Sequence, residues 1–201
     1  MGVPADYPEF VLHQMVTVMR GGEEVKISKR AGSYVTVRDL IDDVGADAVR
    51  YFFLMRKRDS QLVFDVDLAR EQSEKNPVFY VQMAHARLSG IFRTADRDPD
   101  SLSGQLDLEA LRASQDTELL KKLMEFSEVA AAAAREREPH RVTTYLHELA
   151  TVVHGWYHHT RAVGAPEGEA TEGARLLLAR SARIVLANGL HVLGISAPDR
   201  M

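Results

Sequence analysis

In the second half of the chain, hydrophobic residues recur every three or four positions, which is the spacing of one face of an α-helix. The pattern predicts helices over residues 68–93, 116–137 and 171–192, and a further helix from Pro139 to beyond Tyr157. Four long amphipathic helices with modest connections are typical of a bundle. The expected fold class is therefore mainly α.

Details of the pattern predict how these helices pack. The first is expected to kink at Asn76-Pro77, because proline disrupts helical hydrogen bonding. Trp156 and Tyr157 are expected in the core rather than stacked on a base. The last helix has a predicted inner face made of Ala174, Leu177, Leu178, Ser181, Ile184, Val185 and Asn188.

The N-terminal part has a different pattern. An apolar run at residues 15–19 stops at Gly21-Gly22, which predicts a short strand and a tight turn. Thr36 is a predicted helix cap, with Gly45 at the helix end. A second helix is expected from Asp47, and residues 61–67 are expected to form an extended link. This part is too short to bury its own apolar residues, so we expect residues 1–62 to be the end of a larger domain and 63–201 to form a helical domain.

Composition narrows the possible classes of function. The 201 residues are 45% hydrophobic, include no cysteine and carry a net charge of −4. Disulfides and thiolate chemistry are therefore excluded. The start of the chain does not resemble a signal peptide and no apolar run is long enough for a membrane helix, so we expect a cytoplasmic protein without a membrane partner. The acidic balance argues against coating nucleic acid by bulk charge but allows local basic faces.

Two short basic segments are candidates for anion binding. Residues 26–32 place a hydroxyl between Lys26 and Lys29, close to glycines, which suits a polyphosphate or an ordinary solvated turn. Residues 56–58 follow the second predicted helix, where cations complement the helix dipole.

The loop and the residues after it resemble a known family of enzymes. Residues 26–32, followed by 36–41 and 45–52, resemble the Lys-Met-Ser-Lys-Ser loop and connector of class I aminoacyl-tRNA synthetases, including the cysteinyl and methionyl enzymes. Residues 64–87 and 185–201 are more specifically similar to arginyl-tRNA synthetase. The resemblance covers nearly the whole chain.

This resemblance implies an anticodon-binding helical bundle preceded by the end of a catalytic domain. The Rossmann core with its His-x-Gly-His motif and the N-terminal tRNA-binding domain are missing from this sequence, so the chain alone is expected to be inactive and to hold no cofactor. The intact enzyme would use ATP with Mg²⁺. Lys29 would be the catalytic group, stabilising charge on pyrophosphate, with Lys26 and Ser28 also binding ATP. The sequence departs from the signature at Ile27 and Arg30.

For the bundle, the resemblance implies binding of the anticodon arm of arginine tRNA. Tyr80 and Arg87 lie seven residues apart, so they project from nearly the same face of a helix. Both, with Met201, match family positions that bind tRNA. The alternatives are a buried core aromatic for Tyr80 and a surface salt bridge for Arg87.

Three histidines of the next helix fall along one stripe, namely His147, His154 and His158. Histidines four residues apart can bind zinc, but no carboxylate clearly completes a site. We expect no metal; an RNA-facing stripe and ordinary surface histidines remain open.

Other functions stay open on sequence alone. The chain could be a free-standing helical RNA-binding module, a protein-binding scaffold, or part of another class I synthetase such as the cysteinyl enzyme. The synthetase hypothesis predicts a His-x-Gly-His motif encoded upstream of Met1, whereas a free-standing module predicts a true start codon there.

Overall fold

The structure of the protein is a computed structural model, which describes residues 10–25, 35–102 and 107–201. Three short strands are β1 (Val16–Arg20), β2 (Glu23–Glu24) and β3 (Leu62–Asp65). The helices are α1 (Val37–Val44), α2 (Ala46–Leu54), α3 (Val66–Arg70), α4 (Pro77–Ala95), α5 (Ser114–Met124), α6 (Phe126–Glu136), α7 (His140–His159) and α8 (Glu169–Val192), with short 3-10 turns at Pro99–Ser101 and Leu108–Ala110. The expectation of a mainly α fold is confirmed.

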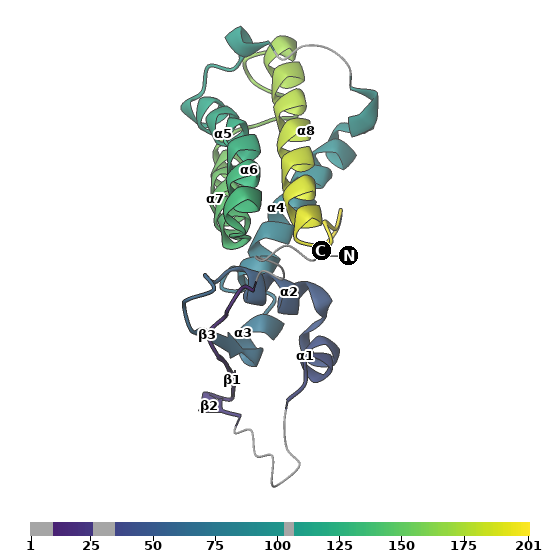
Figure 1. Ribbon diagram of the computed structural model, residues 1–201. Coiled ribbons are helices and arrows are strands. Elements are labelled where there is room, and N and C mark those ends of the chain that lie inside the picture. The colour runs from purple at the N-terminus through teal and green to yellow at the C-terminus, as the bar shows by residue number, and fades with distance from the viewer. Residues whose placement is uncertain (1–9, 26–34, 103–106) are drawn as a thin grey trace, which may run out of the picture.

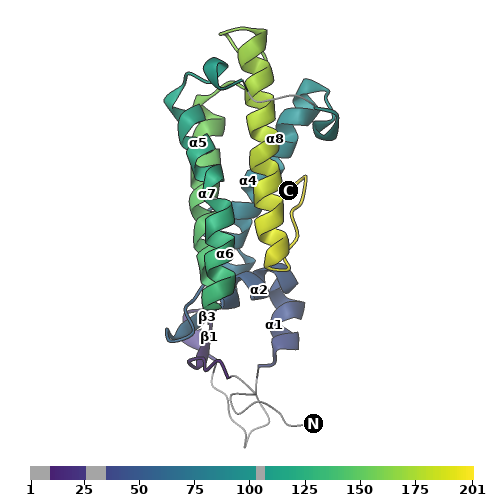
Figure 2. The same ribbon diagram turned by 45° about the horizontal axis from the view of Figure 1, so that its top comes forward.

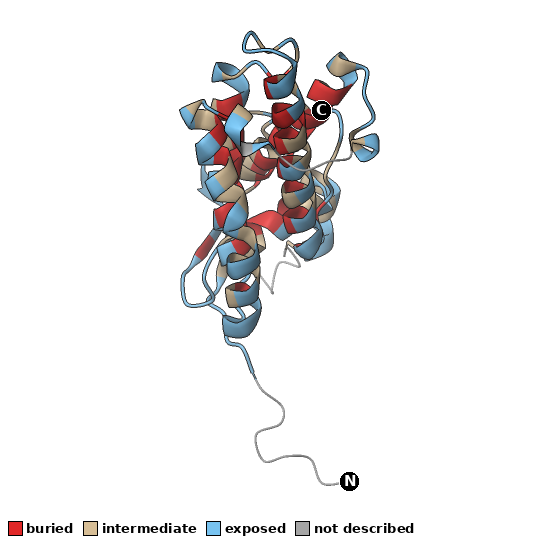
Figure 3. Ribbon diagram, turned by 90° about the horizontal axis from the view of Figure 1, so that it is seen from above, coloured by how far each residue is buried: buried red, intermediate tan, exposed pale blue. Residues whose placement is uncertain are grey.

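Helices α4 to α8 form the bundle. Helix α7 packs against α4, α5, α6 and α8, and α8 also packs against α4 and α5. The strands and α1–α3 lie at one end of the molecule, and α4 leads from them into the bundle (Figures 1 and 2). Buried residues gather on the inward sides of the helices, with exposed residues outside (Figure 3). Helix α4 therefore connects the two halves of the chain.

The strands beside α1–α3 form a small sheet with the order β2-β1-β3. The predicted strand is present as β1, which pairs antiparallel with β2. Residues 61–67 are more than a link, because β3 pairs in parallel with β1, with Val16 opposite Leu62. The expected boundary between residues 62 and 63 falls inside β3.

The predicted start of α1 is confirmed. The Thr36 hydroxyl accepts a hydrogen bond from the Asp39 amide at 3.1 Å, and the Asp39 carboxylate accepts one from the Thr36 amide at 2.7 Å. This reciprocal capping box satisfies two amides that have no partner within the helix. Gly45 then ends α1 with a φ of 84°, a left-handed conformation that glycine adopts without strain.

The single helix predicted over residues 68–93 is wrong, because the chain forms α3 and α4 with a turn between them. Asn76 fixes this turn: its side-chain amide donates to the carbonyls of Ala69 and Glu71 at 3.0 and 2.9 Å. Its side-chain oxygen accepts from the Val78 amide, which caps α4. Pro77 is therefore the first residue of a helix rather than a kink within one.

The single helix predicted over residues 116–137 is also divided, into α5 and α6 at Glu125. In an unbroken helix the Lys122 carbonyl would accept from the Phe126 amide. Here it accepts from the Tyr145 hydroxyl of α7 at 2.9 Å. A helix can break where a side chain forms a hydrogen bond with a backbone carbonyl that would otherwise accept from an amide of the same helix.

The predicted inner face of α8 is rotated from the observed one. Ser181 and Asn188 are exposed and Ile184 is 39% exposed, whereas Ala179, Ala182 and Gly189 are buried. The small residues permit close approach of α7: a Cβ added at Gly189 would lie 2.6 Å from a methyl carbon of Leu146. The inner face of α8 therefore contains small residues, because α7 packs closely against it. A prediction based on large apolar residues places this face wrongly.

Candidate nucleic-acid interface

Tyr80 and Arg87 both face α7, where His154 lies between them. A guanidinium nitrogen of Arg87 lies 2.8 Å from His154 Nδ1, and His154 Nε2 lies 3.1 Å from the Tyr80 carbonyl oxygen. The predicted pair is therefore brought together through a residue of a second helix. Within the described ranges Arg87 bonds to this imidazole rather than to a carboxylate, so the salt-bridge alternative is not observed.

These two hydrogen bonds fix the protonation of His154. A carbonyl oxygen can only accept, so Nε2 carries the proton and donates to Tyr80. The guanidinium can only donate, so Nδ1 offers its lone pair to Arg87. Burial lowers the pKa of His154 and the charge of Arg87 lowers it further, while the bond to the Tyr80 carbonyl acts in the opposite direction. His154 is a neutral link between α4 and α7.

The Tyr80 ring lies in a cluster of flat side chains. Its centroid is 4.5 Å from that of His154 and 5.1 Å from that of His147. Its hydroxyl lies 3.4 Å from the Thr151 hydroxyl. Tyr80 is only partly buried and His147 is exposed, so Tyr80 is not the fully buried core aromatic of the alternative interpretation. Flat, accessible rings are suited to stacking on unpaired bases.

The two neighbouring aromatic residues of α7 lie in different environments. Trp156 is buried in the core as expected, and its indole nitrogen donates to Asp116 at 2.7 Å. The core prediction is wrong for Tyr157, which is 42% exposed. The centroid of its ring lies 5.8 Å from the guanidinium carbon of Arg87. Consecutive helical residues point about 100° apart, so both could not face inward. Tyr157 extends the row of rings along α7.

The C-terminal segment is bound along α4 by a ladder of polar side chains. Gln82 donates to the Ser196 carbonyl at 3.0 Å, and His85 Nδ1 donates to the Pro198 carbonyl at 2.9 Å. Ser89 donates to the Asp199 carboxylate at 2.8 Å. Sequence analysis missed this ladder, although polar residues at positions 82, 85 and 89, three and four residues apart, mark one face of the helix and are a signal for it.

Met201 follows this bound segment directly. It is 52% exposed and lines an open hollow at the start of α4 with Phe79 and Gln82. Among the described residues no hydrogen bond or ring contact joins Met201 to Tyr80 or Arg87. The structure therefore places Met201 near the beginning of the same helix but outside the Tyr80–His154–Arg87 cluster.

The histidine stripe contains two different kinds of histidine. His147 and His158 are exposed, whereas His154 is buried. Both ring nitrogens of His154 have protein partners, which leaves neither for a metal. In the described part of the chain no group of three or more His, Asp and Glu side chains could hold a metal ion.

The residues predicted to bind ATP lie outside the described residues. Lys26, Ser28 and Lys29 fall between β2 and α1. Ammonium and hydroxyl groups are suitable partners for phosphate oxygens. None of the described helices has the length and apolar character needed to cross a bilayer.

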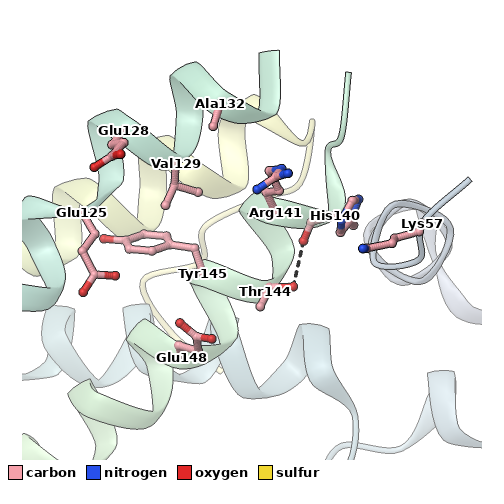
Figure 4. A pocket seen from close by; sticks show the side chains of 10 residues that line it. All are labelled: Lys57, Glu125, Glu128, Val129, Ala132, His140, Arg141, Thr144, Tyr145 and Glu148. Carbon is pink, nitrogen blue, oxygen red and sulfur yellow. Dashed lines mark hydrogen bonds between the residues drawn. The ribbon is translucent and has the colours of Figure 1, made fainter. Parts of the chain in front are cut away.

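An open hollow between α6 and α7 is lined by charged side chains of both signs (Figure 4). Glu125, Glu128 and Glu148 line it together with Lys57 and Arg141. This mixture of charges gives the hollow no clear preference for a nucleic-acid phosphate. The rings and Arg87 between α4 and α7 are chemically better suited to RNA.

Comparisons with known proteins show which family the chain resembles in sequence. The sequence model of the family described as "DALR anticodon binding domain" matches residues 81–201. Over its whole length the chain is 57% identical to an arginine–tRNA ligase of Geobacter metallireducens and 51% identical to one of Bordetella petrii. It spans only 36% and 35% of the lengths of these relatives.

Solved structures show the same similarity. A Campylobacter jejuni structure assigned as an arginyl-tRNA synthetase superposes with a TM-score of 0.83 at 29% identity, covering 94% of this chain and 40% of that one. The arginyl-tRNA synthetase of Thermus thermophilus superposes with a TM-score of 0.67 at 26% identity, covering 92% of this chain and 34% of that one. The bundle and the strands beside it are thus found within longer proteins.

Proposed function

The chain belongs to the family of DALR anticodon-binding domains, and from that premise we propose that it is the C-terminal part of an arginine–tRNA ligase. In this role residues 63–201 hold the anticodon arm of arginine tRNA. The observation that carries the proposal is the Tyr80–His154–Arg87 cluster, which presents a partly exposed ring and a guanidinium side by side between α4 and α7.

Each proposed RNA-binding residue has a distinct role. The Tyr80 ring stacks on an anticodon base, since every base offers a π-face. Arg87 offers directional N–H donors to a base edge, and His154 holds its guanidinium in place. Met201, at the end of a segment bound to α4, adds an apolar contact to the RNA.

Residues 1–62 belong to the catalytic domain in this proposal. Lys26 and Ser28 bind ATP phosphates, and Lys29 stabilises the charge that develops on the departing pyrophosphate. The Rossmann core and an N-terminal tRNA-binding domain belong to the rest of the same polypeptide, where ATP with Mg²⁺ activates arginine. The 201-residue chain alone lacks that core and is inactive, and the intact enzyme works in the cytoplasm.

Binding of an RNA hairpin tests the anticodon proposal. We expect the chain to bind the anticodon arm of arginine tRNA more tightly than an arm with altered anticodon bases, measured by fluorescence anisotropy. Tyr80→Leu should weaken binding by about 1–3 kcal/mol, the usual contribution of one stacked base, whereas Tyr80→Phe keeps the ring and most of the affinity.

Arg87→Ala should weaken the preference for the correct anticodon, and Arg38→Ala, an equal charge change at an exposed position of α1, should not. Thermal melts of each variant separate loss of binding from loss of fold. Equal affinity for correct and altered anticodons would contradict the proposed function.

A further inference from the structure

A second open hollow, of about 420 Å³, lies next to the Tyr80 cluster. Three of its lining residues can donate hydrogen bonds to an anion, and they come from different parts of the fold. Arg56 follows α2, Lys75 precedes α4, and His147 lies on α7. All three are exposed. The fold thus brings positive charge together although the whole chain has a net charge of −4.

The charges of Arg56 and Lys75 are largely unneutralised. Arg56 forms no hydrogen bond or ion pair within the part of the chain that the structure describes. Lys75 has its ammonium 4.0 Å from Glu71 and a side chain that is 79% exposed, which makes this contact weak. The acidic residue in the lining, Glu148, forms an ion pair with the Lys122 ammonium at 2.6 Å, and Lys122 also pairs with Glu125 at 2.8 Å.

Among the described residues, the end of α2 does not bind the Arg56 side chain through a hydrogen bond. Helix α2 ends at Leu54 with Met55 as its C-cap, and Arg56 follows directly. A cation at this position complements the helix dipole, and its N–H groups stay available to a ligand.

The hollow adjoins the proposed stacking surface. His147 lines the hollow, and its ring centroid is 5.1 Å from that of Tyr80. Pro77, also in the lining, precedes Tyr80 by three residues and so lies on a neighbouring part of the α4 surface. The hollow and the proposed stacking surface therefore share His147.

We propose that the hollow lined by Arg56, Lys75 and His147 binds a backbone phosphate of the RNA strand next to the base that stacks on Tyr80. This inference rests on the proposed function. A guanidinium can donate two parallel hydrogen bonds to phosphate oxygens, and the lysine adds a point charge. Such a contact strengthens and positions binding but does not read the base.

The adjacent Lys57 provides a matched contrast. It carries the same charge but lines the hollow between α6 and α7, with Glu125 and Glu128 (Figure 4). Its charge also acts on Glu138 and His140. Arg56 and Lys57 thus line two different hollows, and the phosphate is assigned to the one lined by Arg56.

The test measures how the affinity for the arginine anticodon arm depends on salt. Each phosphate contact to a single strand contributes about 0.7 to the slope of log affinity against log salt. We expect Arg56→Ala and Lys75→Ala each to lower this slope by about 0.7 and to weaken binding about fivefold at 0.1 M salt. Preference for the correct anticodon should be unchanged. Lys57→Ala, the matched control, should alter neither quantity.

A hairpin neutralised at single phosphates locates the contact. Methylphosphonate is placed at each loop position in turn. At one position next to the stacked base, the methylphosphonate should weaken binding to the wild-type chain as much as Arg56→Ala weakens binding of the unmodified hairpin. Binding of the modified hairpin to Arg56→Ala should be no weaker than either change alone produces. That non-additivity is the signature of a direct contact.

The outcomes distinguish this inference from the proposed function. If the wild-type chain prefers the correct anticodon while Arg56→Ala and Lys75→Ala keep the wild-type salt slope, only the phosphate site is overturned. An equal loss of affinity and salt slope in Lys57→Ala also overturns the phosphate site, because the effect would then come from the total charge of the chain. If the wild-type chain shows no anticodon preference, the proposed function falls and this inference falls with it.

Discussion

A single neutral imidazole organises the candidate interface at the scale of residues. His154 donates to the Tyr80 backbone and accepts from the Arg87 side chain, so it spans the two positions that sequence spacing places on one helical face. A protonated His154 would turn an N–H toward the guanidinium, where two donors face each other. The interface therefore depends on the protonation state of one residue.

Acidification should weaken the fold through His154. Its pKa is lowered in the folded protein, chiefly by burial, whereas an unfolded histidine titrates near 6.5. The neutral form therefore stabilises the fold fully above about pH 6.5, and this contribution is lost as the pH falls through the folded pKa. We expect urea denaturation at pH 7.5 and 5.0 to show a larger loss of unfolding free energy in wild type than in His154→Gln.

Both proteins share the other buried histidines, so those contributions cancel in the difference. The pKa of His85 is also lowered, mainly by burial, and it titrates in wild type and variant alike. An identical pH dependence of the two proteins would show that His154 is not a neutral buried link.

The sequence could predict the helical face on which a residue lies, but not the residues of other helices that it contacts. The seven-residue spacing put Tyr80 and Arg87 on one face, because helical geometry is local. Nothing local could show that His154 lies between them, since that depends on how α4 and α7 pack. Tyr157 was misplaced for the same reason: its neighbour Trp156 took the inward position and bonds to Asp116.

At the scale of elements, α4 presents two functional surfaces. Tyr80 and Arg87 face α7, while Gln82, His85 and Ser89 bind the C-terminal segment. The same helix thus sets the position of the proposed reading residues and of the chain end at Met201. Chain ends are usually disordered unless the fold binds them, and here side-chain hydrogen bonds do so.

Removing one part of this ladder should release the chain end. Asp199→Ala removes the carboxylate that accepts from Ser89 at 2.8 Å and from Arg183 at 3.2 Å. Losing a hydrogen bond to a charged group costs roughly 1.5 kcal/mol, enough to raise the open population about tenfold. Carboxypeptidase should therefore release Met201 faster from this variant than from wild type.

Arg200→Ala serves as the control, because Arg200 is exposed and forms no hydrogen bond in the described ranges. A wild-type release rate in Asp199→Ala would mean that the backbone contacts alone hold the segment.

The boundaries of elements followed from sequence only where the signal was local. The cap at Thr36 was predictable, because the hydroxyl and the Asp39 carboxylate lie three residues apart. The break between α5 and α6 was not, because it results from a hydrogen bond between Tyr145 and Lys122, 23 residues apart. A helix boundary set by a long-range hydrogen bond cannot be predicted from hydrophobic periodicity.

At the scale of the whole molecule, strand β2 and helix α1 lie at one end, and helices α5–α8 extend to the other (Figure 1). The ends are not independent folds, because the Tyr51 hydroxyl of α2 donates to the Thr143 carbonyl of α7 at 3.1 Å. The proposed catalytic remnant is therefore fixed to the proposed RNA-binding bundle.

Because the proposed ATP-binding and RNA-binding residues are different, we predict that chemistry and RNA binding can be impaired one at a time. In the full-length enzyme, Lys29→Ala should slow ATP–pyrophosphate exchange about a hundredfold, because it removes a charge that stabilises the developing pyrophosphate. Arginine binding and affinity for the anticodon arm should stay near wild type. Tyr80→Leu should do the reverse, weakening the anticodon arm while leaving exchange intact. Equal loss of exchange and arginine binding in Lys29→Ala would mean that Lys29 supports the ground-state complex rather than the transition state.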